Sequence, residues 1–190
     1  MENLLCIMDD KFWEEYASNA ESNYNEEFSK FIRDLVTSLR CTSVLEVGCN
    51  AGNDLKLFPE SVQVNGLDSN QKIIDISKAR FPSFNFKVGT VTELPYEDNS
   101  IDLVFTHGFM NYLEDDRVSK AVEELFRVAK RYIVNCELLG EDDVIEEKTN
   151  RKGRNMYKKW LEYKVKIISN VEMHEEIDPE KPRFLLVRKL

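Results

Sequence analysis

The sequence predicts an α/β fold: a three-layer sandwich whose seven-stranded sheet is mostly parallel, with one antiparallel strand and extra N-terminal helices. Two observations lead to this expectation. From residue 43 onward, short apolar segments alternate with segments of helical periodicity about ten to fifteen residues long, which is the pattern of βαβ units. The length of 190 residues suits one domain, composed of a helical cap (1–40), a central core (41–137), and an insertion with closing strands (138–190).

The segment 9–40 predicts two helices with a break at Ser22-Asn23. Its apolar and aromatic residues recur at the spacing of one helix face, so most of them are expected in the core. They are Phe12, Trp13, Tyr16, Phe28, Phe31, Ile32, Leu35, Val36 and Leu39.

The core should begin at residue 43. Strands are expected at 43–47, 62–67, 84–88, 101–105 and 132–136, with two closing strands at 164–171 and 183–190. Helices are expected at 51–58, 71–80 and 114–130. Parallel strands joined by right-handed crossovers bind ligands beyond their carboxyl ends. The segments that follow Val47, Leu67, Val88 and Phe105 should therefore converge on one cleft.

Composition excludes several classes of function. There are 26 basic and 35 acidic side chains, and the formal charge of −9 argues against general nucleic-acid binding. No apolar run approaches the roughly 18 residues of a membrane span, and the N-terminus has no signal-peptide pattern, so a cytoplasmic location is expected. Four separated cysteines and two histidines predict neither a disulfide framework nor a metal site. Oligomeric state is not indicated.

The segment Glu46–Gly52 is the most informative. It matches the pattern acidic-x-Gly-x-Gly-x-Gly at three of four marked positions, and Asn50, which replaces the middle glycine, tolerates a left-handed backbone. The dinucleotide fingerprint Gly-x-Gly-x-x-Gly fits worse, because Asn50 and Asn53 stand where it needs glycines. Asp68 ends the next strand, where a carboxylate can accept hydrogen bonds from ribose hydroxyls. Together these features predict a nucleoside site.

The chemistry of this loop favours S-adenosylmethionine over a nicotinamide dinucleotide. A dinucleotide brings two phosphates and needs glycine amides at a helix N-terminus. S-adenosylmethionine brings a sulfonium, an ammonium and a carboxylate. Glu46 suits the ammonium, and the amides of residues 48–52 suit the carboxylate.

Four segments together resemble the motifs of class I S-adenosylmethionine-dependent methyltransferases, over about residues 43–137. They are Val44–Gly52, Gly66–Asn70, Gly89–Tyr96 and Ser100–Phe105. The resemblance implies a Rossmann-like fold and methyl transfer to oxygen or nitrogen of a small molecule. It also implies cofactor contacts at Glu46, Gly48, Cys49, Asn50, Gly52, Asp68, Ser69, Thr90, Val91, Thr106, His107, Met110, Trp13 and Tyr16.

Two positions depart from the family pattern. Thr90 stands where an acidic residue usually accepts from the adenine amino group, so adenine binding should use the Thr90 hydroxyl or the Val91 backbone. Asn111 stands near the place where relatives often carry a histidine, so no catalytic histidine transfers from them. Trp13 and Tyr16 are expected either to fold over the cofactor or to pack in the core.

His107 is the candidate general base. It follows the fourth strand, at the expected cleft, and imidazole titrates near neutrality. The alternative is a hydrogen-bonded structural histidine or a cofactor contact. Cys49 has no histidine close in sequence, so its amide is the expected contributor rather than its thiol.

The acceptor is predicted from a basic stretch at residues 148–159. This stretch is either a clamp for an acidic, possibly sugar-like acceptor, or a solvated segment that neutralises the preceding acidic run. A second resemblance, to methylases of pseudaminic acid biosynthesis, involves residues 12–16, 48–50 and 150–160. Two other functions stay open: a nicotinamide-dependent oxidoreductase and a nucleoside-binding module without turnover.

Overall fold

The computed structural model describes residues 9–147 and 149–190. Its helices are α1 (Asp10–Ser18), α2 (Glu26–Ser38), α3 (Gln71–Arg80), α4 (Asp115–Val128), α5 (Met156–Trp160) and a 3₁₀ turn, η1 (Met110–Tyr112). Its strands are β1 (Ser43–Val47), β2 (Gln63–Asp68), β3 (Asn85–Val88), β4 (Ile101–His107), β5 (Ala129–Glu137), β6 (Val144–Glu146), β7 (Arg151–Lys152), β8 (Val165–Glu172) and β9 (Arg183–Lys189).

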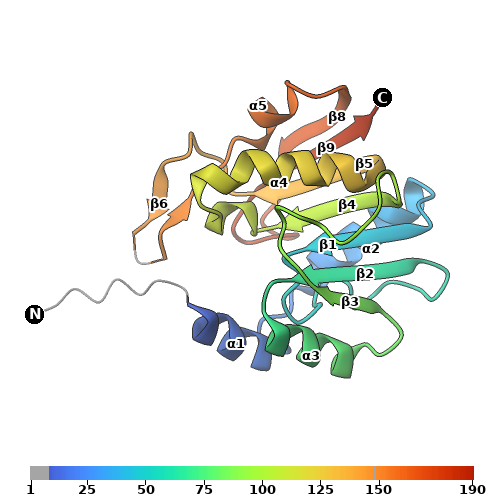
Figure 1. The fold of residues 1–190 in the computed structure, drawn as a ribbon. Helices are drawn as coiled ribbons and strands as arrows, with labels where there is room; N and C mark the ends of the chain where they lie inside the picture. Colours follow the sequence, from blue (N-terminus) through green and yellow to red (C-terminus); the bar gives the residue numbers. More distant parts are fainter. Residues whose placement is uncertain (1–8, 148) are drawn as a thin grey trace, which may run out of the picture.

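The main sheet has seven strands in the order β3-β2-β1-β4-β5-β9-β8 (Figure 1). Strands β1 to β5 pair in parallel, and β9 runs antiparallel to both of its neighbours. The predicted mixed sheet is therefore confirmed. A separate two-stranded sheet, β6 with β7, lies in the insertion.

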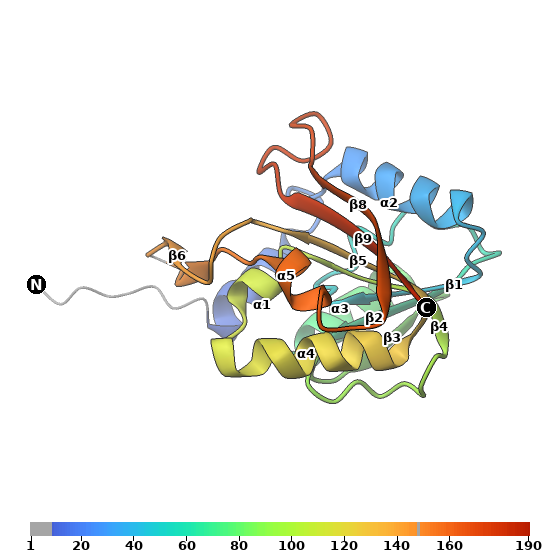
Figure 2. The same ribbon diagram turned by 90° about the horizontal axis from the view of Figure 1, so that it is seen from above.

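Helices cover both faces of the sheet, which gives the three layers (Figure 2). On one face, Leu45 and Val104 pack with the apolar side of α4 and with Trp160 of α5. On the other face, Val44 and Leu103 pack against α2. Neighbouring residues of β1 and β4 thus enter opposite cores, which is why these central strands are apolar on both sides.

The helix termini follow local sequence signals. The side chain of Asn25 caps α2 by accepting from the Phe28 amide, and that of Asn70 caps α3 by accepting from the amides of Lys72 and Ile73. The predicted break at Ser22-Asn23 lies in the turn between α1 and α2.

The helix expected at 51–58 is wrong: the segment forms a series of turns with i to i+3 hydrogen bonds, such as Leu55 N to Gly52 O. Other elements take the carbonyl groups that a helix would use internally. Ser29 of α2 donates to the carbonyls of Asn53 and Asp54, and Arg80 of α3 donates to that of Ala51. Tertiary hydrogen bonds therefore outweigh the local helical pattern here.

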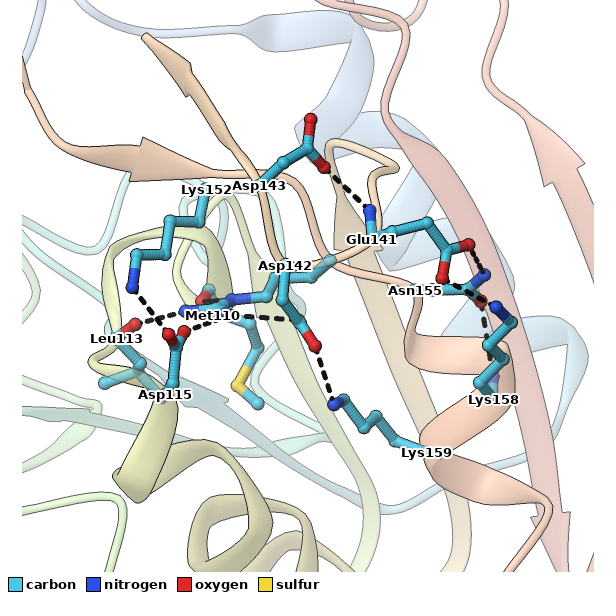
Figure 3. A network of polar contacts seen from close by, with 11 residues as sticks. Met110, Leu113, Asp115, Glu141, Asp142, Asp143, Lys152, Asn155, Lys158 and Lys159 are labelled. Atoms are coloured by element: carbon cyan, nitrogen blue, oxygen red, sulfur yellow. Dashed lines mark hydrogen bonds and ion pairs between the residues drawn. The ribbon is translucent and has the colours of Figure 1, made fainter. Parts of the chain in front are cut away.

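The insertion after β5 is held by a buried arginine (Figure 3). Arg154 is 1% exposed and donates to the carbonyls of Met110 and Leu113 and to the carboxylates of Asp115 and Asp142. These contacts tie the insertion to η1 and to the start of α4. Gly153 meets Gly140 so closely that a Cβ on it would lie 2.5 Å from the other's Cα, so this crossing needs glycine.

Candidate cofactor and acceptor site

A hollow of about 70 Å³ lies beyond the carboxyl ends of β1, β2 and β3 and is closed by the segment that follows β4. Its lining is Gly48, Leu67, Asp68, Ser69, Gly89, Thr90, Val91, Phe109, Leu113 and Arg117. The predicted convergence of the four segments is thus confirmed. Gly48, Asp68, Ser69, Thr90 and Val91 were all predicted as cofactor contacts, and they share this one hollow.

Asp68 is fixed at the tip of β2 by backbone amides. Its two carboxylate oxygens accept from the amides of Asn50 and Asn70, at 3.1 and 3.0 Å. Burial raises the pKa of Asp68, and these amide hydrogen bonds oppose the rise. The carboxylate is therefore oriented by the loop while its remaining lone pairs face the hollow, which suits a pair of ribose hydroxyls.

The loop after β1 adopts the left-handed conformations that its sequence predicts, with φ of 78° at Gly48, 44° at Asn50 and 75° at Gly52. Its amides are already used within the chain. Those of Gly48 and Cys49 donate to the Leu67 carbonyl, and those of Asn50 and Gly52 donate to Asp68 and the Cys49 carbonyl. The expectation that these amides bind a ligand carboxylate does not match this arrangement.

Gly48 has a steric role. A Cβ at this position would lie 2.2 Å from Cδ2 of Phe109, so the aromatic ring rests directly on the glycine backbone. Phe109 thereby narrows the hollow at the tip of β1. The sequence motif marks this glycine, but it gives no sign of the phenylalanine that packs on it.

The far end of the hollow is polar. The Thr90 hydroxyl accepts from Nη2 of Arg117 at 2.8 Å and lies 3.0 Å from the Thr92 hydroxyl. Val91 is buried at 2% exposure beside them. This end therefore offers a hydroxyl, a guanidinium and an apolar wall.

Glu46 lies buried at the tip of β1, and its Oε2 has no hydrogen-bond partner among the described residues. Burial raises its pKa well above the usual value, and the nearby carboxylates of Asp54 and Asp68 raise it further. The protein interior therefore disfavours the charged form of Glu46. A buried, unpaired carboxyl group is a suitable partner for a cation such as the ammonium of S-adenosylmethionine.

His107 ends β4 and lies between two carboxylates. Its Nδ1 is 2.7 Å from Asp54 and its Nε2 is 2.8 Å from Asp178, and its ring stacks on Phe28 with centroids 3.6 Å apart. Burial lowers the pKa of His107, but attraction to Asp54 and hydrogen bonds to both aspartates outweigh it and raise the pKa to about 10. At neutral pH the imidazole is a cation with no free lone pair, which does not suit a general base.

A second pair stands beside His107. Arg151 of β7 donates from both terminal nitrogens to Glu180, and Asp178 accepts the Glu180 amide at 2.9 Å. We refer to Asp54, His107, Arg151, Asp178 and Glu180 as the charged cluster. It contains two cations and three carboxylates that come from four separate segments of the chain.

Five predicted cofactor contacts are buried and do not line the hollow: Glu46, Cys49, Gly52, Thr106 and Met110. Thr106 is fully buried and accepts from Asn135, and Met110 is fully buried among core residues. The Cys49 thiol donates to the Asn50 carbonyl, and burial raises its pKa well above the usual value, so it is no nucleophile. Cys49, Thr106 and Met110 thus support the walls of the site by packing.

The N-terminal helix α1 lies beside the site. Trp13 packs edge-on against Tyr112 with centroids 5.1 Å apart, and it also covers Ala51 of the loop and Ile73 of α3. Tyr16 is 38% exposed, and partial burial, followed by the nearby charge of Asp54, raises its pKa. Of the two predicted lid residues, Trp13 thus packs on the loop and Tyr16 faces the charged cluster.

The basic stretch is largely neutralised within the chain. Arg151 pairs with Glu180, Lys152 and Arg154 with Asp115, Lys158 with Glu141 and Lys159 with Asp142. Most of it therefore holds the insertion in place, and only Arg151 lies in the charged cluster.

Sequence reasoning missed several residues of the site. They are Asp54, Phe109, Leu113, Arg117, Tyr112, Asp178 and Glu180. Phe109 and Leu113 could have been predicted from the sequence, because they follow β4 at the expected cleft. Asp178 and Glu180 carry no local signal, since they stand in an ordinary Asp-Pro-Glu-Lys-Pro turn.

Two general properties of the described part of the chain bear on the site. No helix within residues 9–147 and 149–190 is long and apolar enough to cross a bilayer. The same residues contain no group of three or more potential ligands placed to hold a metal ion.

Comparison with known proteins places this geometry in a family. A model described as "Methyltransferase domain" matches residues 44–131. The chain is 27% identical over 154 residues to the uncharacterized methyltransferase YcgJ of Bacillus subtilis, covering 73% of this chain and 60% of that protein. It is 30% identical over 97 residues to a trans-aconitate 2-methyltransferase of Rhizobium rhizogenes, covering 47% and 37%. The chain thus spans less than two thirds of the length of these curated relatives.

Solved structures show the same fold. A phosphoethanolamine N-methyltransferase from Haemonchus contortus, in complex with phosphoethanolamine and S-adenosylhomocysteine, superposes with a TM-score of 0.70 at 18% identity, covering 95% of this chain and 48% of that one. The family match places residues 44–131, a little under half of the chain, among the class I S-adenosylmethionine-dependent methyltransferases. The solved structure shows that the chain shares its fold with one such enzyme. The comparisons do not support the second resemblance, to methylases of pseudaminic acid biosynthesis.

Proposed function

We propose that this protein is a methyltransferase that uses S-adenosylmethionine to methylate an oxygen or nitrogen atom of a small molecule. The observation that carries the proposal is Asp68, held by two loop amides at the tip of β2 and facing a hollow lined by the tips of β1, β2 and β3. The hollow brings together the backbone of Gly48, the carboxylate of Asp68 and the apolar side chain of Val91, and these are groups that an adenosine can contact.

The residues of the site fit this cofactor. Asp68 and Ser69 would hold the ribose, and Thr90 and Val91 would line the adenine. Glu46, with its unpaired Oε2, would face the ammonium. S-adenosylmethionine supplies a methyl group activated by its sulfonium charge.

Binding requires the cleft to widen. The hollow of about 70 Å³ is much smaller than the roughly 300 Å³ at the lower end of small-ligand sites. Phe109, which rests on Gly48, is the side chain whose movement would enlarge it. We therefore assign to Phe109 the role of a wall that moves aside when the nucleoside enters.

The protein's part in the reaction is to position and to desolvate the acceptor. His107, protonated between Asp54 and Asp178, serves to order the cleft wall and does not remove a proton. Without a neutral base beside the reacting atom, placement of the two reactants must supply most of the rate acceleration. An amine or carboxylate acceptor, which needs no strong base, suits such a site.

Calorimetry tests the cofactor. We expect S-adenosylhomocysteine to bind with a Kd in the micromolar range, about −8 kcal/mol, and NAD⁺ not to bind. Binding of NAD⁺ with comparable affinity would favour the oxidoreductase alternative and contradict the proposal. A nucleoside-binding module without turnover is separated by a second assay, in which labelled methyl groups are followed into a panel of small amines and carboxylates.

A further inference from the structure

Arg151 combines a buried guanidinium with an exposed partner. The residue is 8% exposed, yet the side chain of Glu180, which accepts from both of its terminal nitrogens at 2.7 and 2.6 Å, is 56% exposed. In addition, Nε of Arg151 is buried without a hydrogen-bond partner among the described residues. The guanidinium of Arg151 is thus held in place with one of its donors unsatisfied, while the carboxylate of Glu180 is exposed to solvent.

The guanidinium of Arg151 lies beside the carboxyl end of β4. Its Cζ lies 5.2 Å from the centroid of Tyr112, a stacking contact that fixes its plane. Its Nη2 lies 3.8 Å from where a Cβ on Gly108 would stand, just past the tip of β4. Gly108 follows His107 at the end of β4, and ligands of such sheets bind beyond the carboxyl ends of the strands, so Arg151 lies on the side of the sheet where a methyl acceptor would bind.

A carboxylate is the ligand that this arrangement recognises. A guanidinium presents a planar fork of donors that matches two carboxylate oxygens, and Glu180 demonstrates that fit within the chain. A free carboxylate that replaced Glu180 would leave the net charge of the cluster unchanged.

We propose that Arg151 binds a carboxylate group of the methyl acceptor, and that Glu180 occupies the same position until the acceptor displaces it. This inference rests on the proposed function and names its substrate class: small molecules that carry at least one carboxylate. Asp178 stays on His107 during the exchange, while Glu180 turns into solvent. Glu180, in the loop between β8 and β9, therefore competes with the acceptor carboxylate for Arg151.

The experiment uses the full chain saturated with S-adenosylhomocysteine, and tricarballylate as the probe. Binding is measured by calorimetry for the unaltered protein, Glu180→Ala, Arg151→Gln and the control Glu175→Ala, which removes an exposed carboxylate of the same loop that pairs with Lys181. We expect Glu180→Ala to bind the probe about tenfold more tightly, Arg151→Gln at least tenfold more weakly, and the control as the unaltered protein does.

Each outcome decides between explanations. Equal binding by Glu180→Ala and the unaltered protein would overturn the competition, and unchanged binding by Arg151→Gln would overturn the assignment of the arginine. Tighter binding of inorganic phosphate than of tricarballylate in Glu180→Ala would overturn the carboxylate class. If Arg151→Gln fails to fold, Glu180→Ala still tests the proposal alone. Failure of S-adenosylhomocysteine to bind the unaltered protein would instead contradict the proposed function.

Discussion

The two halves of the cleft are built in opposite ways. The half at the tips of β1, β2 and β3 is a hollow, framed by a loop and by residues close to one another in each motif. The half beyond β4 is filled by the charged cluster, in which His107 meets partners 53 and 71 residues away in the sequence. The proposed nucleoside side is therefore formed by local backbone geometry, whereas the proposed acceptor side is formed by long-range ion pairing.

The largest expected effect is on the pH dependence of the free energy of unfolding, and it tests the charged cluster. The pKa of His107 is raised to about 10, so its contribution is complete below about pH 6.5 and is lost as pH rises toward 10. At 1.36 kcal/mol per pH unit, the upper limit of the loss is about 5 kcal/mol. Urea unfolding from pH 6 to 10 should show the unaltered protein losing stability faster than His107→Gln. Parallel curves would mean that the cluster does not hold a protonated histidine.

Arg154 gives the next largest effect, on the acceptor side. We expect Arg154→Met to reduce the free energy of unfolding by about 2–4 kcal/mol, because buried carbonyls of Met110 and Leu113 lose their donor. The matched control is Lys158→Met, whose exposed pair with Glu141 should contribute less than about 1 kcal/mol. Equal effects in the two variants would show that the insertion is not anchored by the buried arginine.

The nucleoside side is tested through Asp68. Asp68→Ala should weaken binding of S-adenosylhomocysteine by about 1.5–3 kcal/mol, the range for hydrogen bonds to a charged group. Asp75→Ala, which removes an exposed carboxylate from α3, should bind as the unaltered protein does. Calorimetry measures both, and an unchanged affinity in Asp68→Ala would remove Asp68 from the ribose.

Glu46 gives the smallest expected change and the sharpest chemical distinction. Burial raises the pKa of Glu46 and so disfavours its charged form, and glutamine is uncharged and of nearly the same size; Glu46→Gln should therefore change the free energy of unfolding by less than about 0.5 kcal/mol. The same substitution should weaken the binding of S-adenosylhomocysteine by about tenfold, because the ligand's ammonium group loses its partner. Methylthioadenosine, which lacks the amino-acid portion, should bind both forms equally. A loss for both ligands would place Glu46 at the nucleoside instead.

The contrast also explains what the sequence could predict. Strands, their order of appearance, and Asp68 at the tip of β2 follow from apolar runs and motif spacing, which are local. The position of His107 after β4 was predictable, but its protonation state was not, because Asp54 and Asp178 become its neighbours only in the fold. Arg151 belongs to the basic stretch that the sequence predicts as a possible clamp, but the sequence cannot single it out, since burial is what separates it from Lys158.

The turns at 51–58 have a consequence for how the molecule opens. Their carbonyls depend on Ser29 of α2 and Arg80 of α3, and Nδ2 of Asn53 donates to Ala20 ahead of α2. In a helix these carbonyls would accept hydrogen bonds from amides of the same segment. Here the donors belong to elements that precede and follow the segment in the chain. Its amide protons should therefore exchange with solvent together with those of the N-terminal region, as one cooperative unit, and a nick between α1 and α2 should loosen the glycine loop at a distance.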